Sequence, residues 1–92
     1  MEDFDDDEWA EMQGMYISHT LKELNTIKED IESTTYDSLR TFGHNIKGSG
    51  GMYGFNEITD MGANIESAAK DSDIDKIKSN LETLEIFLKS KL

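Results

Sequence analysis

The sequence predicts an all-α protein. The expected architecture is an antiparallel four-helix bundle, with or without a short extra N-terminal helix. The 92 residues include no proline, the residue that most strongly interrupts helices. Charged residues make up 32% of the chain, and apolar residues recur at helical spacing along it. A chain of this length forms one domain with one small core. We therefore expect a bundle over residues 9–92, preceded by an acidic arm, residues 1–8.

The first two helices are predicted over about residues 9–33 and about residues 36–52. In the first, Gly14 would divide a short leading helix from the main one. The break between the two contains three hydroxyl residues, 33–35, and such side chains cap helix N-termini well. The apolar stripe of the first helix consists of Ile17, Leu21, Leu24, Ile27 and Ile31.

The third helix is predicted over residues 55–70, and a fourth is expected after the capping segment 71–73. The fourth carries a stripe with heptad-like spacing, and the short connections make neighbouring helices antiparallel. The inward positions are Ile58, Met61, Ile65 and Ala69 in the third helix and Ile74, Ile77, Leu81, Leu84 and Leu88 in the fourth.

Charge and composition exclude several classes of protein. The net charge of −11 argues against nucleic acid, whose phosphates would be repelled. There is no cysteine, and no apolar run approaches the length of a membrane span. We expect a soluble, cytoplasmic monomer. Residues 2–8 hold six of the 20 acids, which leaves 14 acids against 9 bases elsewhere. Those six acids favour the positive end of the first helix, or alternatively attract a basic partner.

One long stretch of this acidic chain carries no carboxylate. Between Ser38 and Asn56 the charged residues are Arg40 and Lys47, and they accompany His44; histidine is the residue type that can change its charge near neutral pH. A nearby negative charge raises the free energy of a group that must itself become negative. We therefore expect His44 to lie in a site that avoids negative neighbours.

Helical geometry places His44 on the solvent face. At about 100° per residue it lies about 200° from Ile46, which shares the apolar stripe with Leu39, Phe42 and Tyr53. Its surface neighbours on the helix are Lys47, at i+3, and Gly48, at i+4. Glycine costs about 0.5 to 1 kcal/mol inside a helix, so the repeated glycines either keep this surface flat or end the helix. The face shared with His44 contains Arg40, Lys47, Gly48 and Gly51.

The residues from His44 onward resemble a known family. The run His44-Asn45-Ile46-Lys47-Gly48-Ser49, then Gly54-Phe55 and the later Ile65-Glu66-Ser67-Ala68-Ala69, are similar to the histidine-containing phosphotransfer (HPt) domain. Its hallmark is H-x-x-K-G-[SA], followed by a G-[AF] turn and an L-E-x-A-A-like helix end. The N-terminal half fits only by helix pattern and length.

The resemblance implies a phosphorelay protein of two-component signal transduction. His44 would be a phosphohistidine carrier, exchanging phosphate with the aspartate of a response-regulator receiver domain. Lys47 would offset phosphate charge, and Gly48 would let the receiver approach closely. Arg40, Ser49 and Gly51 are further candidates for partner docking. Partners would be a receiver and a sensor or hybrid histidine kinase. We expect no cofactor, no metal held by this chain and no kinase activity of its own, because a divalent metal would sit in the receiver's acids.

Two alternatives stay open. The same motif resembles the histidine-bearing domain of a chemotaxis-type kinase, in which the phosphate comes from ATP. The other alternative is a phosphate-independent interaction bundle that uses the bare glycine surface. The second histidine, His19, is predicted to be an ordinary surface residue, because it lies about 200° from both Ile17 and Leu21.

Overall fold

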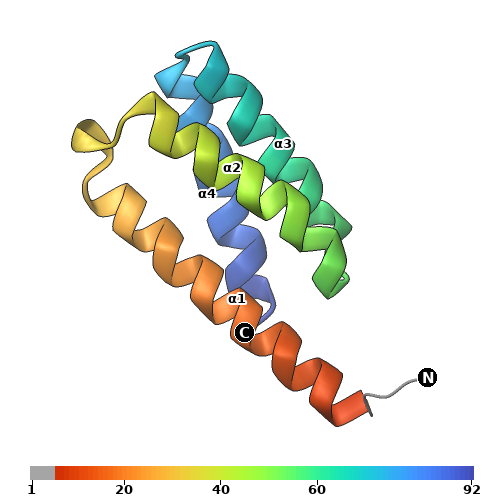
Figure 1. Ribbon diagram of the computed structural model, residues 1–92. Helices are drawn as coiled ribbons and strands as arrows, with labels where there is room; N and C mark the ends of the chain where they lie inside the picture. The colour runs from red at the N-terminus through yellow and green to blue at the C-terminus, as the bar shows by residue number, and fades with distance from the viewer. Residues whose placement is uncertain (1–5) are drawn as a thin grey trace.

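The structure, a computed structural model, describes residues 6–92, which form a bundle of four α-helices (Figure 1). The bundle is elongated, measuring 43 × 21 × 17 Å. The described residues contain no strand, so the predicted all-α class is confirmed. None of these helices is long and apolar enough to cross a bilayer. The elements are α1 (Asp6–Glu29), η1 (Ile31–Ser33), α2 (Tyr36–Gly50), η2 (Gly51–Tyr53), α3 (Asn56–Lys70) and α4 (Ile74–Ser90), where η1 and η2 are single 3-10 turns.

The first helix differs from its prediction near its N-terminus. α1 runs through Gly14 without a break, so the separate leading helix is absent from the described residues. A Cβ at Gly14 would meet no atom within 4 Å, and a single glycine costs too little to interrupt a helix that packs along its length. The helix also begins inside the acidic arm, with Asp6, Asp7 and Glu8 in its first turn. Carboxylates there interact favourably with the positive end of the helix dipole. The arm's other acids, Glu2, Asp3 and Asp5, lie outside the described residues.

Of the remaining helices, α2 and α4 begin at side-chain caps, whereas α3 begins after Phe55 with no side-chain cap. The Thr35 hydroxyl accepts a hydrogen bond from the Ser38 amide at 3.0 Å, and the Asp73 carboxylate accepts one from the Lys76 amide at 3.1 Å. α2 ends two residues earlier than predicted, because the chain tightens into η2. Gly54 follows in the left-handed region, with φ of 86°, which a glycine adopts without strain.

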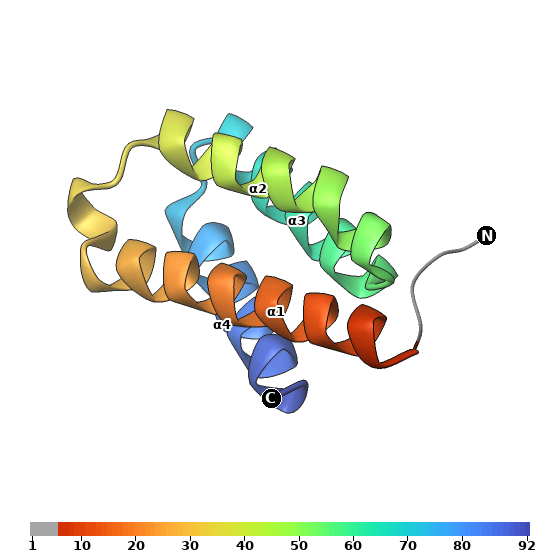
Figure 2. The same ribbon diagram turned by 60° about the horizontal axis from the view of Figure 1, so that its bottom comes forward.

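The predicted apolar stripes meet in one core. α2 and α3 form the most closely packed pair, whereas α4 packs on α3 and on α1. α1 contacts η2, just past the end of α2, and Figures 1 and 2 show the α1 ribbon set apart from most of the α2 ribbon. The predicted inward residues are buried or packed against the core, except Tyr53, which stacks on Tyr16 outside it. The residues less than 2% exposed include Ile17, Leu24, Leu39, Ile58, Ile65, Ile77, Leu81, Leu84 and Leu88.

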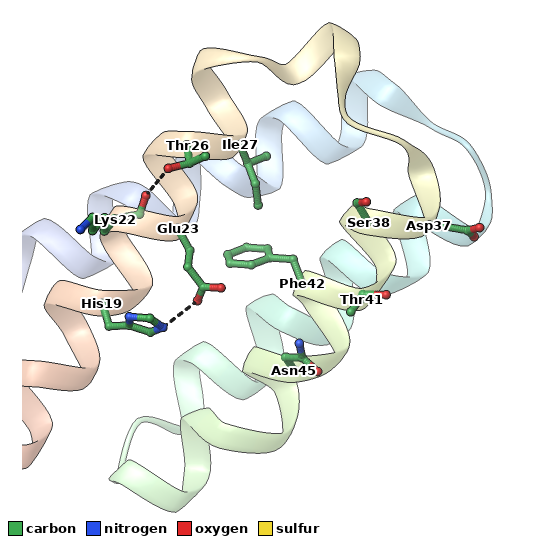
Figure 3. Close-up of a pocket in the computed structure, with 10 residues that line it drawn as sticks. All are labelled: His19, Lys22, Glu23, Thr26, Ile27, Asp37, Ser38, Thr41, Phe42 and Asn45. Atoms are coloured by element: carbon green, nitrogen blue, oxygen red, sulfur yellow. Dashed lines mark hydrogen bonds and ion pairs between the residues drawn. The ribbon is translucent and has the colours of Figure 1, made fainter.

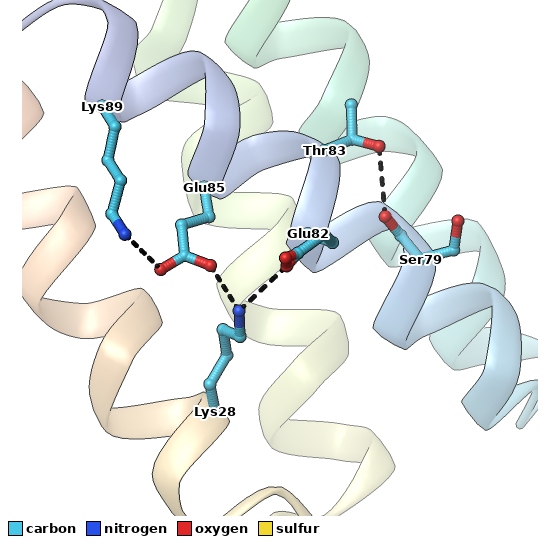
Figure 4. A network of polar contacts seen from close by, with 6 residues as sticks. All are labelled: Lys28, Ser79, Glu82, Thr83, Glu85 and Lys89. Atoms are coloured by element: carbon cyan, nitrogen blue, oxygen red, sulfur yellow. Dashed lines mark hydrogen bonds and ion pairs between the residues drawn. The ribbon is translucent and has the colours of Figure 1, made fainter.

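A network of ion pairs joins the C-terminal part of α1 to α4 (Figure 4). The Lys28 ammonium lies between Glu82, at 3.3 Å, and Glu85, and Lys89 approaches the other oxygen of Glu85 at 3.2 Å. The hydrogen bond from Lys28 is the largest cause of the lowered pKa of Glu85. Partly exposed pairs of this kind contribute little individually. The network bridges α1 and α4 near the end of α1 remote from η2.

Candidate functional site

His44 lies in the middle of α2, on the face that points away from the core. Phe42 and Ile46 are buried on the opposite side of the helix, whereas 65% of the His44 side chain is exposed. The division follows from helical spacing, because two residues correspond to about 200° of rotation. The prediction that the imidazole faces water is confirmed.

A carboxylate of α3 lies directly beside this histidine. Oε2 of Glu66 is 3.1 Å from His44 Nδ1, and Oε1 of the same residue is 2.7 Å from Lys47 Nζ. Only 12% of the Glu66 side chain is exposed. The prediction that the site avoids negative neighbours is therefore wrong. The carboxylate-free stretch of sequence describes α2 alone, and α3 supplies the acid from 22 positions along the chain.

Glu66 is the functional residue that sequence reasoning missed. It stands in the segment that carried the family resemblance, directly after the inward-facing Ile65, yet it was assigned no role. Its spacing gave a signal, because an acid next to an inward residue on a helix packed against α2 lies at the boundary of the core. That boundary is where a side chain can be covered and still reach an exposed neighbour.

The carboxylate decides which imidazole nitrogen carries the proton. An ionised glutamate is only an acceptor, so neutral His44 donates its Nδ1–H to Glu66 and keeps the lone pair on Nε2. The pKa of Glu66 is lowered, first by the hydrogen bond from Lys47 and further by that from His44, while desolvation opposes both. The carboxylate is therefore ionised at neutral pH, and Nε2 is the nitrogen free to react.

Two glycines allow α3 to approach closely enough to place Glu66 there. A Cβ at Gly62 would lie 2.6 Å from the Lys47 amide nitrogen and 2.7 Å from the Gly43 carbonyl oxygen. A Cβ at Gly43 would lie 2.7 Å from the Glu66 amide nitrogen. These distances are too short for real side-chain contacts, so the backbones cross through this gap only because both residues lack Cβ. Sequence reasoning passed over both glycines, because their pairing depends on how the two helices cross.

Thr59 holds the end of α2 from the same side. Its hydroxyl donates to the Lys47 carbonyl at 2.9 Å and accepts from the Gly51 amide at 2.9 Å. The first bond satisfies a carbonyl of the last turn of α2, a group that a helix C-terminus can leave unpaired, and the second ties the C-cap residue to α3. Gly51 itself is exposed, with helical φ of −63°, and a Cβ there would make ordinary contact with Thr59. Gly51 is therefore accessible to a partner and also anchored to α3.

The other candidates on this face differ in accessibility. Gly48 is exposed, and a Cβ there would meet nothing within 4 Å. Arg40 is also exposed, one turn before His44. Ser49 is half-buried, and its hydroxyl lies 2.7 Å from that of Tyr16 in α1. The Tyr16 ring stacks on Tyr53, with centroids 4.4 Å apart. Ser49 therefore joins α2 to α1 and presents little of itself to a partner.

Two hollows flank this part of α2. The smaller, about 290 Å³, lies at His44 itself and is lined by Arg40, Thr41, His44, Glu66 and Lys70. The larger, about 670 Å³, lies between α1 and α2 (Figure 3). There the His19 ring points toward the Glu23 carboxylate, 3.6 Å away, and 72% of the His19 side chain is exposed. His19 is a surface residue, as predicted. Within residues 6–92 no three His, Asp or Glu side chains gather as a metal-binding group.

The pH dependence of stability tests the Glu66 contacts. Because its pKa lies below the ordinary 4.5 in the folded chain, the ionised Glu66 stabilises the fold above that pH. This contribution is lost as the pH falls through the folded pKa. We expect Glu66→Gln to be less stable than the wild type at neutral pH, and the gap to close in acid. Thermal unfolding between about pH 2 and about pH 6 measures it. Glu11→Gln, at an exposed position of α1, is the control. A gap that stays constant into acid contradicts the assignment.

Comparison with known proteins agrees with this arrangement. The family model for the Hpt domain matches residues 11–90, all of the chain except its first ten and last two residues. No curated protein and no solved structure matches the chain. The family match spans the four helices and both partners in the His44–Glu66 contact. The chain belongs to the Hpt domain family.

Proposed function

We propose that His44 carries a phosphoryl group and exchanges it with the aspartate of a response-regulator receiver domain in a phosphorelay. Membership of the Hpt family implies histidine phosphotransfer in two-component signalling. The observation that carries the assignment to His44 is the Glu66 hydrogen bond, which orients an exposed imidazole and leaves its Nε2 lone pair outward. His19, paired at 3.6 Å with an exposed glutamate, lacks such a covered partner.

The transfer is an in-line displacement. Nε2 of His44 attacks the phosphorus of the receiver's phosphoaspartate, a P–N bond forms, the P–O bond breaks and the aspartate leaves as a carboxylate. The imidazole gains positive charge during this step, because Nδ1 keeps its proton. Glu66 offsets that charge across the 3.1 Å hydrogen bond. The reverse reaction returns the group to a receiver.

The neighbouring residues have separate roles in the proposal. The Lys47 ammonium lies one turn from His44 and offsets the negative charge of the phosphoryl group. Glu66 already neutralises part of the positive charge of Lys47. Gly48 leaves the surface beside the imidazole open to the receiver. Any divalent metal is bound by the receiver's carboxylates, because Mg²⁺ prefers oxygen ligands. This chain needs no cofactor of its own, and it acts as a carrier without kinase activity.

The direct test uses receiver domains from the same genome, each phosphorylated on its aspartate with acetyl phosphate. Mixed with the chain, a cognate receiver should transfer phosphate that is acid-labile and base-stable, as phosphohistidine is. Mass spectrometry of the peptides should place it on His44. Label on another residue contradicts the assignment. Labelling only by a kinase with ATP, and by no receiver, would favour the chemotaxis-type alternative. No labelling by either would favour a phosphate-independent interaction bundle.

Gly48 separates docking from chemistry. Gly48→Gln should slow transfer from a receiver, because the longer side chain stands where the partner approaches. It should leave labelling by phosphoramidate unchanged, because this small donor needs no docking surface. Gly48→Ala should raise the unfolding free energy by up to about 1 kcal/mol, since its Cβ enters open space and alanine favours helix. Unchanged receiver transfer in Gly48→Gln would remove the glycine from the interface.

A further inference from the structure

We propose that Arg40 and Lys70 form, with Thr41, an anion pocket that holds the phosphoryl group of phosphorylated His44. This inference rests on the proposed function of His44. The starting observation is the hollow of about 290 Å³ that the imidazole itself lines. Arg40 enters it from α2 one turn before His44, and Lys70 enters from the last turn of α3, one turn after Glu66. The pocket therefore joins two helices around the reactive ring.

The three cations near His44 differ in whether they form an ion pair. Lys47 is held by Glu66 at 2.7 Å, so its charge is already largely matched. Neither Arg40 nor Lys70 forms an ion pair with any residue of the described range 6–92, although both line the same hollow as the carboxylate. The Glu66 carboxylate already accepts one hydrogen bond at each oxygen, from His44 and from Lys47. Arg40 and Lys70 are the positive groups left available to a new anion.

The charge balance matches a phosphoryl group. Around neutral His44 the three cations and the single carboxylate leave a local charge of +2, within a chain whose net charge is −11. A phosphoryl group at neutral pH adds about −1.5 to −2. The local excess is therefore cancelled when His44 is phosphorylated. Arginine offers several N–H donors in one plane, which suits phosphate oxygens, and the Thr41 hydroxyl adds a further donor.

This role differs from docking a partner, and the choice of donor tells them apart. Phosphoramidate labels histidine without a protein partner: its P–N bond breaks, ammonia leaves, and the new P–N bond forms at His44 Nε2. Purified full-length chains would be compared as wild type, Arg40→Gln, Lys70→Gln and the double variant. Lys76→Gln, at an exposed position of α4, is the matched control for loss of one positive charge. The labelling rate and the half-life of the phosphohistidine are measured at low and high salt.

We expect each single variant to lower the labelling rate about twofold to fivefold, the size of a partly exposed charge contact. The double variant should lose more, and Lys76→Gln should match the wild type. Arg40→Lys and Lys70→Arg should recover part of the rate. In about 1 M salt the differences should shrink, because the Debye length falls to about 3 Å.

Three results overturn the inference. If both variants label at the wild-type rate and only transfer from a receiver slows, Arg40 and Lys70 dock the partner and do not hold the phosphoryl group. If Lys76→Gln slows labelling equally, the effect comes from net charge and the pocket has no part in it. If the wild type takes no label at His44 from phosphoramidate or from any receiver, the proposed function itself fails. The variants' unfolding temperatures should match the wild type, because both side chains are exposed.

Discussion

Replacing His44 with glutamine is expected to abolish phosphate acceptance completely, from a phosphorylated receiver and from phosphoramidate alike. Glutamine has no nucleophilic nitrogen, because its amide lone pair is delocalised into the carbonyl group. The fold should persist, because the side chain is 65% exposed and substitutions at such positions change stability by about ±0.5 kcal/mol. Circular dichroism and thermal unfolding measure the fold, and phosphate incorporation measures the chemistry.

His19→Gln is the matched control, because it makes the same substitution at the chain's other histidine, which is also exposed. It should label at the wild-type rate. Residual label in His44→Gln would mean that another residue accepts phosphate. Loss of label in His19→Gln, with His44 intact, would move the site to the groove between α1 and α2.

The second large effect is expected at Gly62, in stability. Gly62→Ala puts a Cβ within 2.6 to 2.8 Å of the Lys47 amide nitrogen, the Gly43 carbonyl oxygen and the Ile46 side chain. Two of these are backbone atoms, which cannot move without spreading α2 and α3 apart. Overpacking of this kind costs about 1 to 3 kcal/mol, and it outweighs the gain of up to about 1 kcal/mol from replacing a helical glycine. Chemical denaturation measures the difference in unfolding free energy.

Gly14→Ala provides the matched control, because a Cβ there meets no atom within 4 Å. It should be neutral or stabilising by up to about 1 kcal/mol. Gly62→Ala should also slow labelling of His44, since spreading the helices draws Glu66 away from the imidazole. A Gly62→Ala chain as stable as Gly14→Ala would contradict the close crossing that places Glu66.

Much of the fold follows from periodicity along the chain. The stripes of α3 and α4 predicted their buried residues, and the caps at Thr35 and Asp73 marked where helices begin. The errors lie where a local signal competes with packing. Gly14 looked like a break, but α1 continues through it, and η1 and η2 replace the predicted ends of the first two helices. A glycine or a hydroxyl lowers the local preference for helix without deciding whether tertiary contacts override it.

Part of the site could likewise be predicted from the sequence, and part could not. The exposure of His44 and its surface neighbours within α2 could be predicted, because they depend on the geometry of one helix. Glu66 could not be placed, because its contact depends on the angle and separation at which α3 crosses α2. That separation is set by Gly43 and Gly62, two residues with no side chain to form a pattern. The charge of the site was therefore misjudged, whereas the exposure of its histidine was predicted correctly.

The division of the site between α2 and α3 links its reactivity to cooperative folding. An isolated peptide of residues 36–53 would contain His44, Lys47 and the glycines that follow them in α2, yet it would lack the carboxylate that selects the imidazole tautomer. We expect such a peptide to take phosphate from phosphoramidate no faster than free imidazole. In a urea titration of the whole chain, the excess reactivity of His44 should disappear in the same transition as the helical signal. The phosphoacceptor would then be activated only in molecules whose tertiary structure is formed, and partly folded chains would not carry signal.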